Sequence, residues 1–189
     1  MGVRLDNDVL RWRAEAYARI AALCMLGDDR LAAVIGTNGI DELTGCLSYA
    51  GGCARLDTEI ERSHRVGAPL CCSFLDLDGF KRVNDRDGHL AGNEVLAGVG
   101  AAFLSDLRVY DAVARFGGDE FVLILPGTEL ADARSIARRL VDRAMARTSN
   151  HVSTAFSISC GTAQLDGEGD AAGLLEAADR ELRLAKAAR

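Results

Sequence analysis

The sequence predicts an α/β fold of the α+β type, in which helices flank a central sheet that is mixed and mainly antiparallel. Apolar runs with strand character alternate along the chain with segments whose apolar residues recur at helical spacing. Two of these runs are separated by a short turn with Gly117 and Gly118, which predicts a β-hairpin because glycine reaches the positive φ angles of tight turns. With 189 residues, 49% of them hydrophobic, the chain can form one compact domain over residues 40–189, preceded by a helical extension over residues 1–36.

The N-terminal half is predicted to contain three helices and one buried strand. Residues 6–26 and 28–36 carry apolar residues at helical spacing, and a further helix is expected over residues 46–66. Pro69 then precedes the apolar run of residues 70–77, which is typical of a buried strand. A polar loop is expected to lead from this strand into the next helix.

The C-terminal half continues the alternation. Glycine and proline mark its boundaries, because Pro126-Gly127 interrupts the chain and Thr128 is a suitable helix cap. In chain order we expect a helix over 92–107, strands over 112–116 and 121–125, a helix over 128–147, a strand over 153–163, a loop over 166–170 and a helix over 171–188.

Composition excludes several classes of function. A net charge of −6 argues against general nucleic-acid binding, although a nucleotide needs only a few local cations. No apolar run approaches the roughly 18–20 residues that cross a bilayer, and the N-terminus lacks a signal-peptide pattern, so no membrane association is expected. A reducing, cytoplasmic location is expected because no C-x-x-C pair occurs among the six cysteines, which are Cys24, Cys46, Cys53, Cys71, Cys72 and Cys160.

The most informative segment runs from Arg115 to Phe121 and reads Arg-Phe-Gly-Gly-Asp-Glu-Phe. Asp119 and Glu120 follow the glycine turn directly, at the start of a strand, where acidic residues are depleted. Adjacent carboxylates beside a turn without side chains suit a hard metal ion that carries phosphates. The alternative is a solvated hairpin tip, and this segment alone does not decide between the two.

A second polar set follows the first strand. Asp76 and Asp78 interrupt an apolar run, and a carboxylate in such a strand is costly unless it is paired or bound to metal. The side chains that come next are polar and close together in the sequence: Lys81, Asn84, His89 and Asn93. The alternative is a strand end followed by a solvated loop. The spacing lacks the terminal glutamate of an EF-hand.

Taken together, these segments resemble the GGDEF domain of diguanylate cyclases over about residues 40–189. The matching pieces occur in the family's order and spacing: Asp41-Glu-Leu-Thr-Gly45, Asp76-Leu-Asp-Gly-Phe-Lys81, Asn84-Asp85, Gly88-His89, Arg115 to Phe121, Ser157-Ile-Ser159 with Gly161, and Ala185-Lys186. The resemblance implies a fold like that of nucleotidyl cyclases and polymerase palms. It also implies a reaction in which two GTP are joined into cyclic di-GMP with release of two pyrophosphates, catalysed by a homodimer.

The resemblance implies a role for each polar residue. Asp76, the Leu77 carbonyl and Asp119 would hold Mg²⁺ (or Mn²⁺), and Glu120 would serve the second metal or the proton of the 3′-hydroxyl group. Asp119 and Glu120 are therefore the expected catalytic residues. The expected substrate contacts are Lys81, Asn84, His89, Asn93, Arg115 and Lys186, although Arg115 could instead be a structural ion-pair partner.

The sequence departs from the family pattern at Asn93, where the family has an aspartate that reads guanine. A carboxylate accepts from both the N1–H and the N2–H₂ of guanine, whereas an amide offers one acceptor and one donor. An amide suits the adenine edge, so ATP is an alternative substrate and an adenine-containing product an alternative outcome. Compensation by water or a main-chain group would instead retain guanine.

Arg108 and Asp111 fit the family's inhibitory R-x-x-D motif, which binds the cyclic dinucleotide product. Arg138 or Arg139 from a neighbouring domain could complete that site. The main rival to an enzyme is a binding module for nucleotides or cyclic dinucleotides, in which the Asn93 change has disabled turnover.

Overall fold

The computed structural model describes residues 39–149 and 152–188 of the chain. The helical extension expected over residues 1–36 lies outside the described residues. The described elements are, in order, α3 (Tyr49–Val66), β1 (Leu70–Asp78), α4 (Phe80–Asp87), α5 (His89–Asp106), β2 (Ala112–Arg115), β3 (Glu120–Pro126), α6 (Leu130–Thr148), β4 (Ser157–Gln164) and α7 (Ala171–Ala187).

The four described strands form one sheet in the order β2-β3-β1-β4, and every neighbouring pair is antiparallel. The connection from β1 to β2 passes through α4 and α5 and skips over β3. The connection from β3 to β4 passes through α6 and skips over β1. Two such crossovers around a hairpin form the split βαβ arrangement of ferredoxin-like folds. The predicted fold class, a mainly antiparallel sheet flanked by helices, is confirmed.

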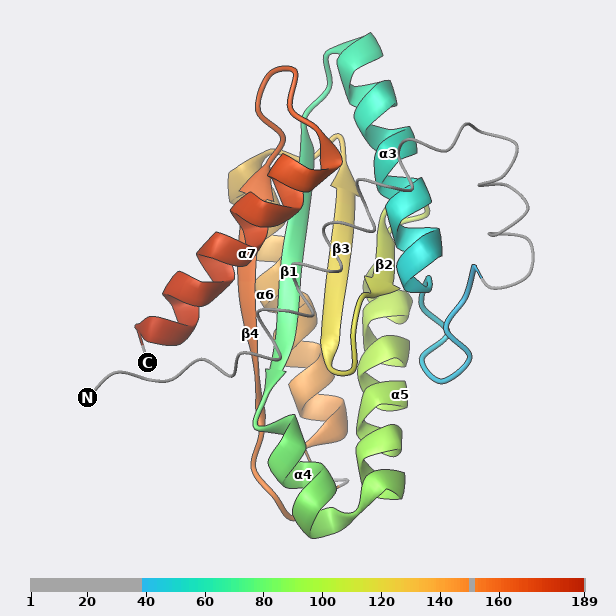
Figure 1. The fold of residues 1–189 in the computed structure, drawn as a ribbon, viewed down its shortest axis with the longest axis vertical. Helices are drawn as coiled ribbons and strands as arrows, with labels where there is room; N and C mark the ends of the chain where they lie inside the picture. Colours follow the sequence, from blue (N-terminus) through green and yellow to red (C-terminus); the bar gives the residue numbers. More distant parts are fainter. Residues whose placement is uncertain (1–38, 150–151, 189) are drawn as a thin grey trace.

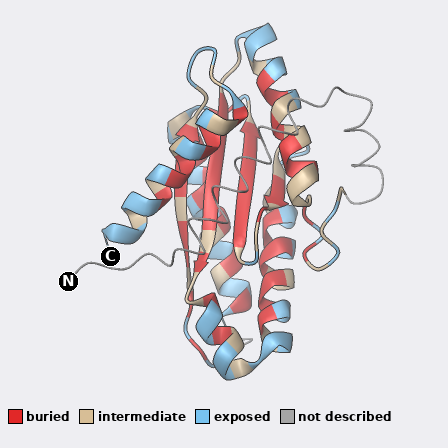
Figure 2. Ribbon diagram, in the orientation of Figure 1, coloured by how far each residue is buried: buried red, intermediate tan, exposed pale blue. Residues whose placement is uncertain are grey.

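Helices cover both faces of the sheet (Figure 1). Strand side chains alternate between the faces, so Leu75 and Leu77 of β1 join the core beneath α5 and α6, while Cys72 and Phe74 join the core beneath α3 and α7. The strands are buried almost throughout, and exposed residues lie on the outer surfaces of the helices (Figure 2). Apart from the buried Ser73, both faces of β1 are apolar until its last residues, so its two carboxylates lie at one end of the sheet.

Two cysteines of β1 lie in these cores, as expected of small hydrophobic residues. Cys71 and Cys72 are fully buried, and burial raises the pKa of the Cys71 thiol to about 12. The described cysteines are all free thiols. Among the described helices, none combines the length and apolar character that crossing a membrane requires.

Residues 80–87 form helix α4, where the sequence suggested a loop, and α5 starts at His89 rather than at residue 92. Helix α4 is only eight residues long and buries Phe80 and Val83, which lie three residues apart on one helical face. It is bounded by Gly79 and Gly88, both with positive φ. Two apolar residues in a polar segment are too weak a periodic signal to predict a helix.

The predicted cap of α6 was wrong. Thr128 donates its hydroxyl hydrogen bond to the Pro126 carbonyl, and Glu129 occupies the N-cap without a side-chain bond to the helix. Instead, the side-chain oxygen of Gln164 on β4 accepts a hydrogen bond of 2.9 Å from the Leu130 amide. A residue from a distant strand therefore satisfies the first turn of the helix.

Strand β4 is shorter at its start than the expected 153–163. The Asp87 carboxylate, at the end of α4, accepts hydrogen bonds from the backbone amides of Ser153 and Thr154 and from the Ser153 hydroxyl. These bonds lower the pKa of Asp87. They also hold residues 153 and 154 in a loop, so pairing with β1 begins only at Ser157.

Candidate active site

The candidate site lies where β1 ends beside the β2–β3 hairpin. The register pairs Asp76 of β1 with Glu120 of β3, so their side chains leave the sheet on the same face. The next residue of β1, Leu77, donates its backbone amide to the Asp119 carbonyl over 3.2 Å. The strand pairing therefore brings together Asp76, Leu77, Asp119 and Glu120, the four residues expected to serve the metals.

Arg115 holds the hairpin turn in place. Its guanidinium donates to both carboxylate oxygens of Asp41 at 3.2 Å, to the Gly118 carbonyl at 2.8 Å and to the Gly117 carbonyl at 3.2 Å. Asp41 also accepts from the amide and the hydroxyl of Thr44. Of the two roles considered for Arg115, the described contacts match that of a structural ion-pair partner.

Asp119 sits in an environment that disfavours its charge. Burial, followed by the negative charge of Asp76, raises the pKa of Asp119 to about 6, although Lys186 and Arg115 oppose the rise. A neighbouring negative charge disfavours ionisation of a partly buried carboxyl group, whereas a nearby cation favours it. The site is therefore electrostatically prepared for a positive charge.

Lys186 supplies one such charge from the last turn of α7. Its ammonium lies 2.5 Å from Asp76 Oδ1 and 3.5 Å from Asp78 Oδ1. Asp78 in turn accepts hydrogen bonds from the hydroxyls of Ser159, at 2.6 Å, and Ser157, at 3.1 Å. Lys186 was expected to contact phosphate, and in this structure its described partners are these two carboxylates.

Asp78, Ser157 and Ser159 had no predicted role in the site. The available signal was the spacing of the two serines, since residues two apart in a strand share a face. Their partner Asp78 stands out in the sequence as the second carboxylate that interrupts the apolar run of β1.

The donor set suits Mg²⁺. Among the described residues, no group of three or more histidine, cysteine or acidic side chains is arranged to hold a metal ion. Mg²⁺ does not require such a group, since it is commonly bound by one or two carboxylates together with substrate phosphates and water. Asp76, Asp119 and the Leu77 carbonyl offer only oxygen ligands. A bound cation would stabilise the ionised form of Asp119, whose pKa is raised by burial and by the charge of Asp76.

The residues expected to read the base gather where α4 meets α5. Asn84 lies directly against Gly92, because a Cβ atom built on Gly92 would come within 2.0 Å of the Asn84 side-chain oxygen. Asn93 follows Gly92, and His89 lies one turn before Asn93 on the same exposed side of α5. Lys81 is exposed on the first turn of α4.

The expected inhibitory motif forms a turn just before β2. The Arg108 amide donates to the Asp111 carboxylate over 3.1 Å, and the Arg55 guanidinium of α3 donates to the Tyr110 carbonyl over 2.7 Å. Arg138 and Arg139 are exposed on α6, which packs on α5 as well as on β4 and β1. One turn further along α6, Arg143 forms an ion pair with Asp106, two residues before Arg108.

The chain is similar in sequence to a known protein family and to individual relatives. The family model described as "Diguanylate cyclase, GGDEF domain" matches residues 38–189. The chain is 41% identical over 150 residues to diguanylate cyclase DgcP of Pseudomonas aeruginosa, covering 78% of this chain and 22% of that protein. It is 34% identical over 151 residues to diguanylate cyclase DosC of Escherichia coli, covering 78% of this chain and 33% of that protein. The chain thus spans no more than about a third of these two relatives.

A solved structure extends the similarity to the fold. Diguanylate cyclase SiaD of Pseudomonas aeruginosa, solved in complex with its activator SiaC, superposes with a TM-score of 0.73 at 33% identity. The match covers 96% of this chain and 71% of the SiaD chain.

Proposed function

Because the chain belongs to the GGDEF diguanylate cyclase family, we propose that it condenses two GTP into cyclic di-GMP and releases two pyrophosphates. One observation carries the proposal: β1 and the hairpin bring Asp76 and Asp119 together, with the Lys186 ammonium 2.5 Å from Asp76. Transfer of a nucleotidyl group depends mainly on positioning and on neutralising phosphate charge, and this cluster offers both.

The residues divide the work by position. Asp76, the Leu77 carbonyl and Asp119 would hold Mg²⁺ or Mn²⁺, which when bound neutralises phosphate charge and activates the attacking oxygen. Glu120, on the same face as Asp76, would accept the proton of the 3′-hydroxyl or serve a second metal. Lys186 would move from the carboxylates to the phosphates when nucleotide and metal arrive, and Lys81 would contact the phosphates from α4.

Catalysis is proposed to require two protomers. Each domain offers one such cluster, whereas the product contains two phosphodiester bonds related by a two-fold axis. A C2 dimer sets the 3′-hydroxyl of each nucleotide against the α-phosphate of the other. The rate per protomer should then rise with protein concentration, and a rate that stays constant upon extensive dilution would contradict the dimer.

Asn93 is the basis for an alternative proposal, in which the chain catalyses the same cyclisation but selects less strongly for guanine. With Asn84 beside Gly92 and Asn93 next in the chain, two amides would face the base edge. Replacing Asn93 with aspartate restores two acceptors for guanine and removes one mismatched contact worth about 1–3 kcal/mol, so GTP selectivity over ATP should rise about tenfold or more. The measurement is kcat/KM for both nucleotides in parent and variant. An unchanged ratio would mean that Asn93 does not read the base.

A product-binding inhibitory site is proposed at Arg108 and Asp111, completed by Arg139 of a second protomer. The motif's turn is ordered by the Arg108–Asp111 hydrogen bond and by Arg55, and both charged side chains remain at the surface. Cyclic di-GMP bound there would be distant from the cluster at the end of β1.

The deciding experiment incubates the purified chain with Mg²⁺ and GTP, ATP or both, and identifies the products by mass. Cyclic di-GMP from GTP alone supports the proposal, and an adenine-containing cyclic product from the mixture supports the alternative. Asp119→Ala is the matched control, because it removes a proposed metal ligand and should abolish product while the far-UV circular dichroism is kept. If the parent protein binds nucleotide but forms no product, the chain is a nucleotide-binding module rather than an enzyme.

A further inference from the structure

Asp78, the last residue of β1, is oriented by two serines of β4. The register pairs Asp78 with Ser157 and Asp76 with Ser159, so the four side chains lie on one face of the sheet. Oδ2 of Asp78 accepts from the Ser159 hydroxyl at 2.6 Å and from the Ser157 hydroxyl at 3.1 Å. A carboxylate oxygen has two lone pairs, so these two donors occupy Oδ2 and fix the orientation of the carboxylate.

The other oxygen of Asp78 faces Lys186. The Lys186 ammonium lies 3.5 Å from Asp78 Oδ1 and 2.5 Å from Asp76 Oδ1, so it bridges two carboxylates. These carboxylates differ in their surroundings. Asp76 pairs with Glu120 at the last step of the β1–β3 register, whereas Asp78 lies beyond that step and contacts β4.

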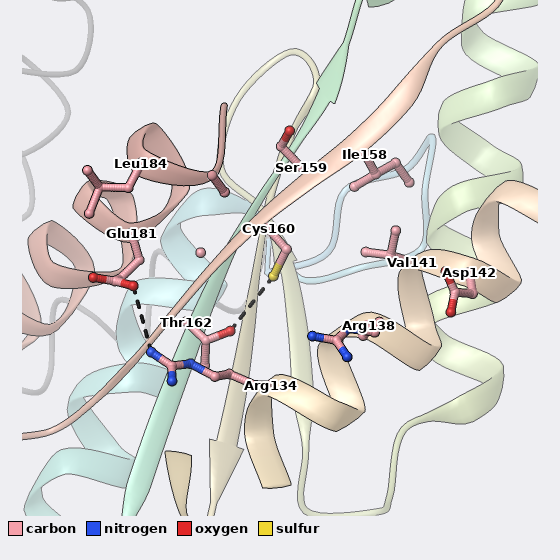
Figure 3. Close-up of a pocket in the computed structure, with 12 residues that line it drawn as sticks. Arg134, Arg138, Val141, Asp142, Ile158, Ser159, Cys160, Thr162, Glu181 and Leu184 are labelled. Atoms are coloured by element: carbon pink, nitrogen blue, oxygen red, sulfur yellow. Dashed lines mark hydrogen bonds and ion pairs between the residues drawn. The ribbon is translucent and has the colours of Figure 1, made fainter. Parts of the chain in front are cut away.

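The close approach of α7 to β4 sets the position of Lys186. Ser159 and the next residue, Cys160, leave β4 in different directions, and Gly161 shares the face of Ser159 (Figure 3). A Cβ atom built on Gly161 would come within 2.0 Å of the Leu182 amide nitrogen, so the α7 backbone lies directly on this face. Lys186 follows Leu182 by one helical turn and therefore starts above the serines and Asp78.

We propose that Asp78 is a positioning residue, which keeps Lys186 in the active site after Asp76 has given up its ion pair with the lysine. The inference rests on the proposed cyclase function, in which Asp76 is a metal ligand. An ammonium has three donors, so Lys186 can keep Asp78 while it contacts a phosphate. Without Asp78, the phosphates would have to order a flexible four-carbon side chain themselves.

A role of Asp78 as a metal ligand makes a different prediction. A positioning residue acts only through Lys186, whereas a metal ligand acts whether or not the lysine is present. Asp78→Asn separates the two roles with little change in shape. Its side-chain oxygen can still accept from the serines, and its NH₂ group then faces Lys186 in place of a carboxylate oxygen.

The first experiment measures the mobility of Lys186 by NMR and requires no turnover. The 189-residue chain contains two lysines, so labelling with ¹³C,¹⁵N-lysine gives side-chain signals from Lys81 and Lys186 alone. Lys81 is exposed on α4 and is the internal reference. In EDTA, Lys186 of the Asp76→Ala variant should remain more restrained than Lys81, because Asp78 still holds it. Adding Asp78→Asn should raise its mobility to that of Lys81.

A second variant keeps this experiment decisive if Asp78→Asn does not fold. Ser157→Ala combined with Ser159→Ala, in the Asp76→Ala protein, leaves Asp78 charged but free to turn. The mobility of Lys186 should again increase, and the backbone amide spectrum of the same sample shows whether the fold is kept.

The second experiment measures kcat/KM for GTP with Mg²⁺, with the product quantified by mass so that slow variants stay measurable. Asp78→Asn should lower kcat/KM about tenfold and leave the Mg²⁺ requirement unchanged. In the Lys186→Ala background, Asp78→Asn should have no further effect. Asp166→Asn, an exposed carboxylate beyond the other end of β4, is the matched control and should follow the parent.

Three results would overturn the proposal. Lys186 as mobile as Lys81 in Asp76→Ala would mean that Asp78 does not hold the lysine. Continued restraint after both substitutions would assign that role to another group. A loss of rate that persists in the Lys186→Ala background, or a raised Mg²⁺ requirement, would make Asp78 a metal ligand. A parent without cyclase activity would instead refute the proposed function, and the NMR experiment would still decide whether Asp78 holds Lys186.

Discussion

Replacing Asp119 with asparagine is expected to stabilise the protein in the absence of divalent metal at neutral pH. Burial and the charge of Asp76 raise the pKa of Asp119 from 3.8 to about 6 in the folded state. The difference of about two pH units, at 1.36 kcal/mol each, corresponds to roughly 3 kcal/mol. Asparagine carries no charge at any pH and so avoids this cost.

The sign follows from proton linkage. A carboxyl group with a raised folded-state pKa holds its proton more tightly when folded than when unfolded. The free energy of unfolding therefore decreases as pH rises from about 4 to about 6 and stays lower above that range. The Asp119→Asn variant should be more stable than the parent by about 3 kcal/mol near pH 8, and this advantage should vanish near pH 4.

The assay is urea unfolding in EDTA, followed by circular dichroism, between about pH 4 and pH 8. Asp85→Asn, on the exposed side of α4, is the matched control for loss of a carboxylate and should follow the parent throughout. Adding Mg²⁺ should narrow the gap at neutral pH, because the cation stabilises only the ionised parent. If Asp119→Asn is no more stable than the parent near pH 8 in EDTA, then the carboxylate is not strained and the electrostatic account of the site is wrong.

Three further substitutions test other parts of the structure. Arg115→Ala should lower the free energy of unfolding by about 1.5–3 kcal/mol, since it removes charged hydrogen bonds to Asp41 and to the turn; a double-mutant cycle with Asp41→Ala should be clearly non-additive, and additive losses would exclude the pair. Gly161→Ala should cost about 3 kcal/mol or more in urea unfolding, because the new methyl group would meet the α7 backbone; Gly118→Ala, with nothing within 4 Å, is the control, and similar losses in both would contradict the close packing of α7. Arg108→Ala should relieve inhibition by added cyclic di-GMP without changing the initial rate, and equal inhibition of variant and parent would remove this site.

The sheet could be predicted well from the sequence because its signals are local. The apolar run from residue 70 and the Gly117–Gly118 turn are each visible within a few residues. Once these strands are placed side by side, alternation decides which side chains share a face. The meeting of Asp76 with Glu120 follows from that register.

The misses have a common physical origin in contacts between distant parts of the chain. Gln164 satisfies the first turn of α6 from another strand, and no local pattern at Thr128 could reveal this. Asp87 shortens β4 by binding Ser153 across 66 residues. Helix α4 depends on burying Phe80 and Val83 against the core, which its mostly polar sequence conceals.

Arg115 shows where sequence reasoning about a site reaches its limit. A cation next to a turn rich in glycine suits either phosphate binding or fixing the turn, and both readings use the same residue types. Only the position of Asp41, 74 residues earlier in the chain, distinguishes them. The same holds for Asp78, whose serine partners lie 79 and 81 residues away.

The site combines rigid support with unfavourable charge. Arg115 and Asp41 neutralise one another, and Arg115 fixes the turn that immediately precedes Asp119. Asp76 and Asp119 nevertheless repel each other in a partly buried place, which raises the pKa of Asp119. The fold keeps the two carboxylates close together despite their repulsion. A cation that binds between them would therefore need little rearrangement of the chain and would relieve the repulsion. We expect Lys186 to leave Asp76 if a metal ion binds there, because the long lysine side chain reaches Asp76 from the last turn of α7.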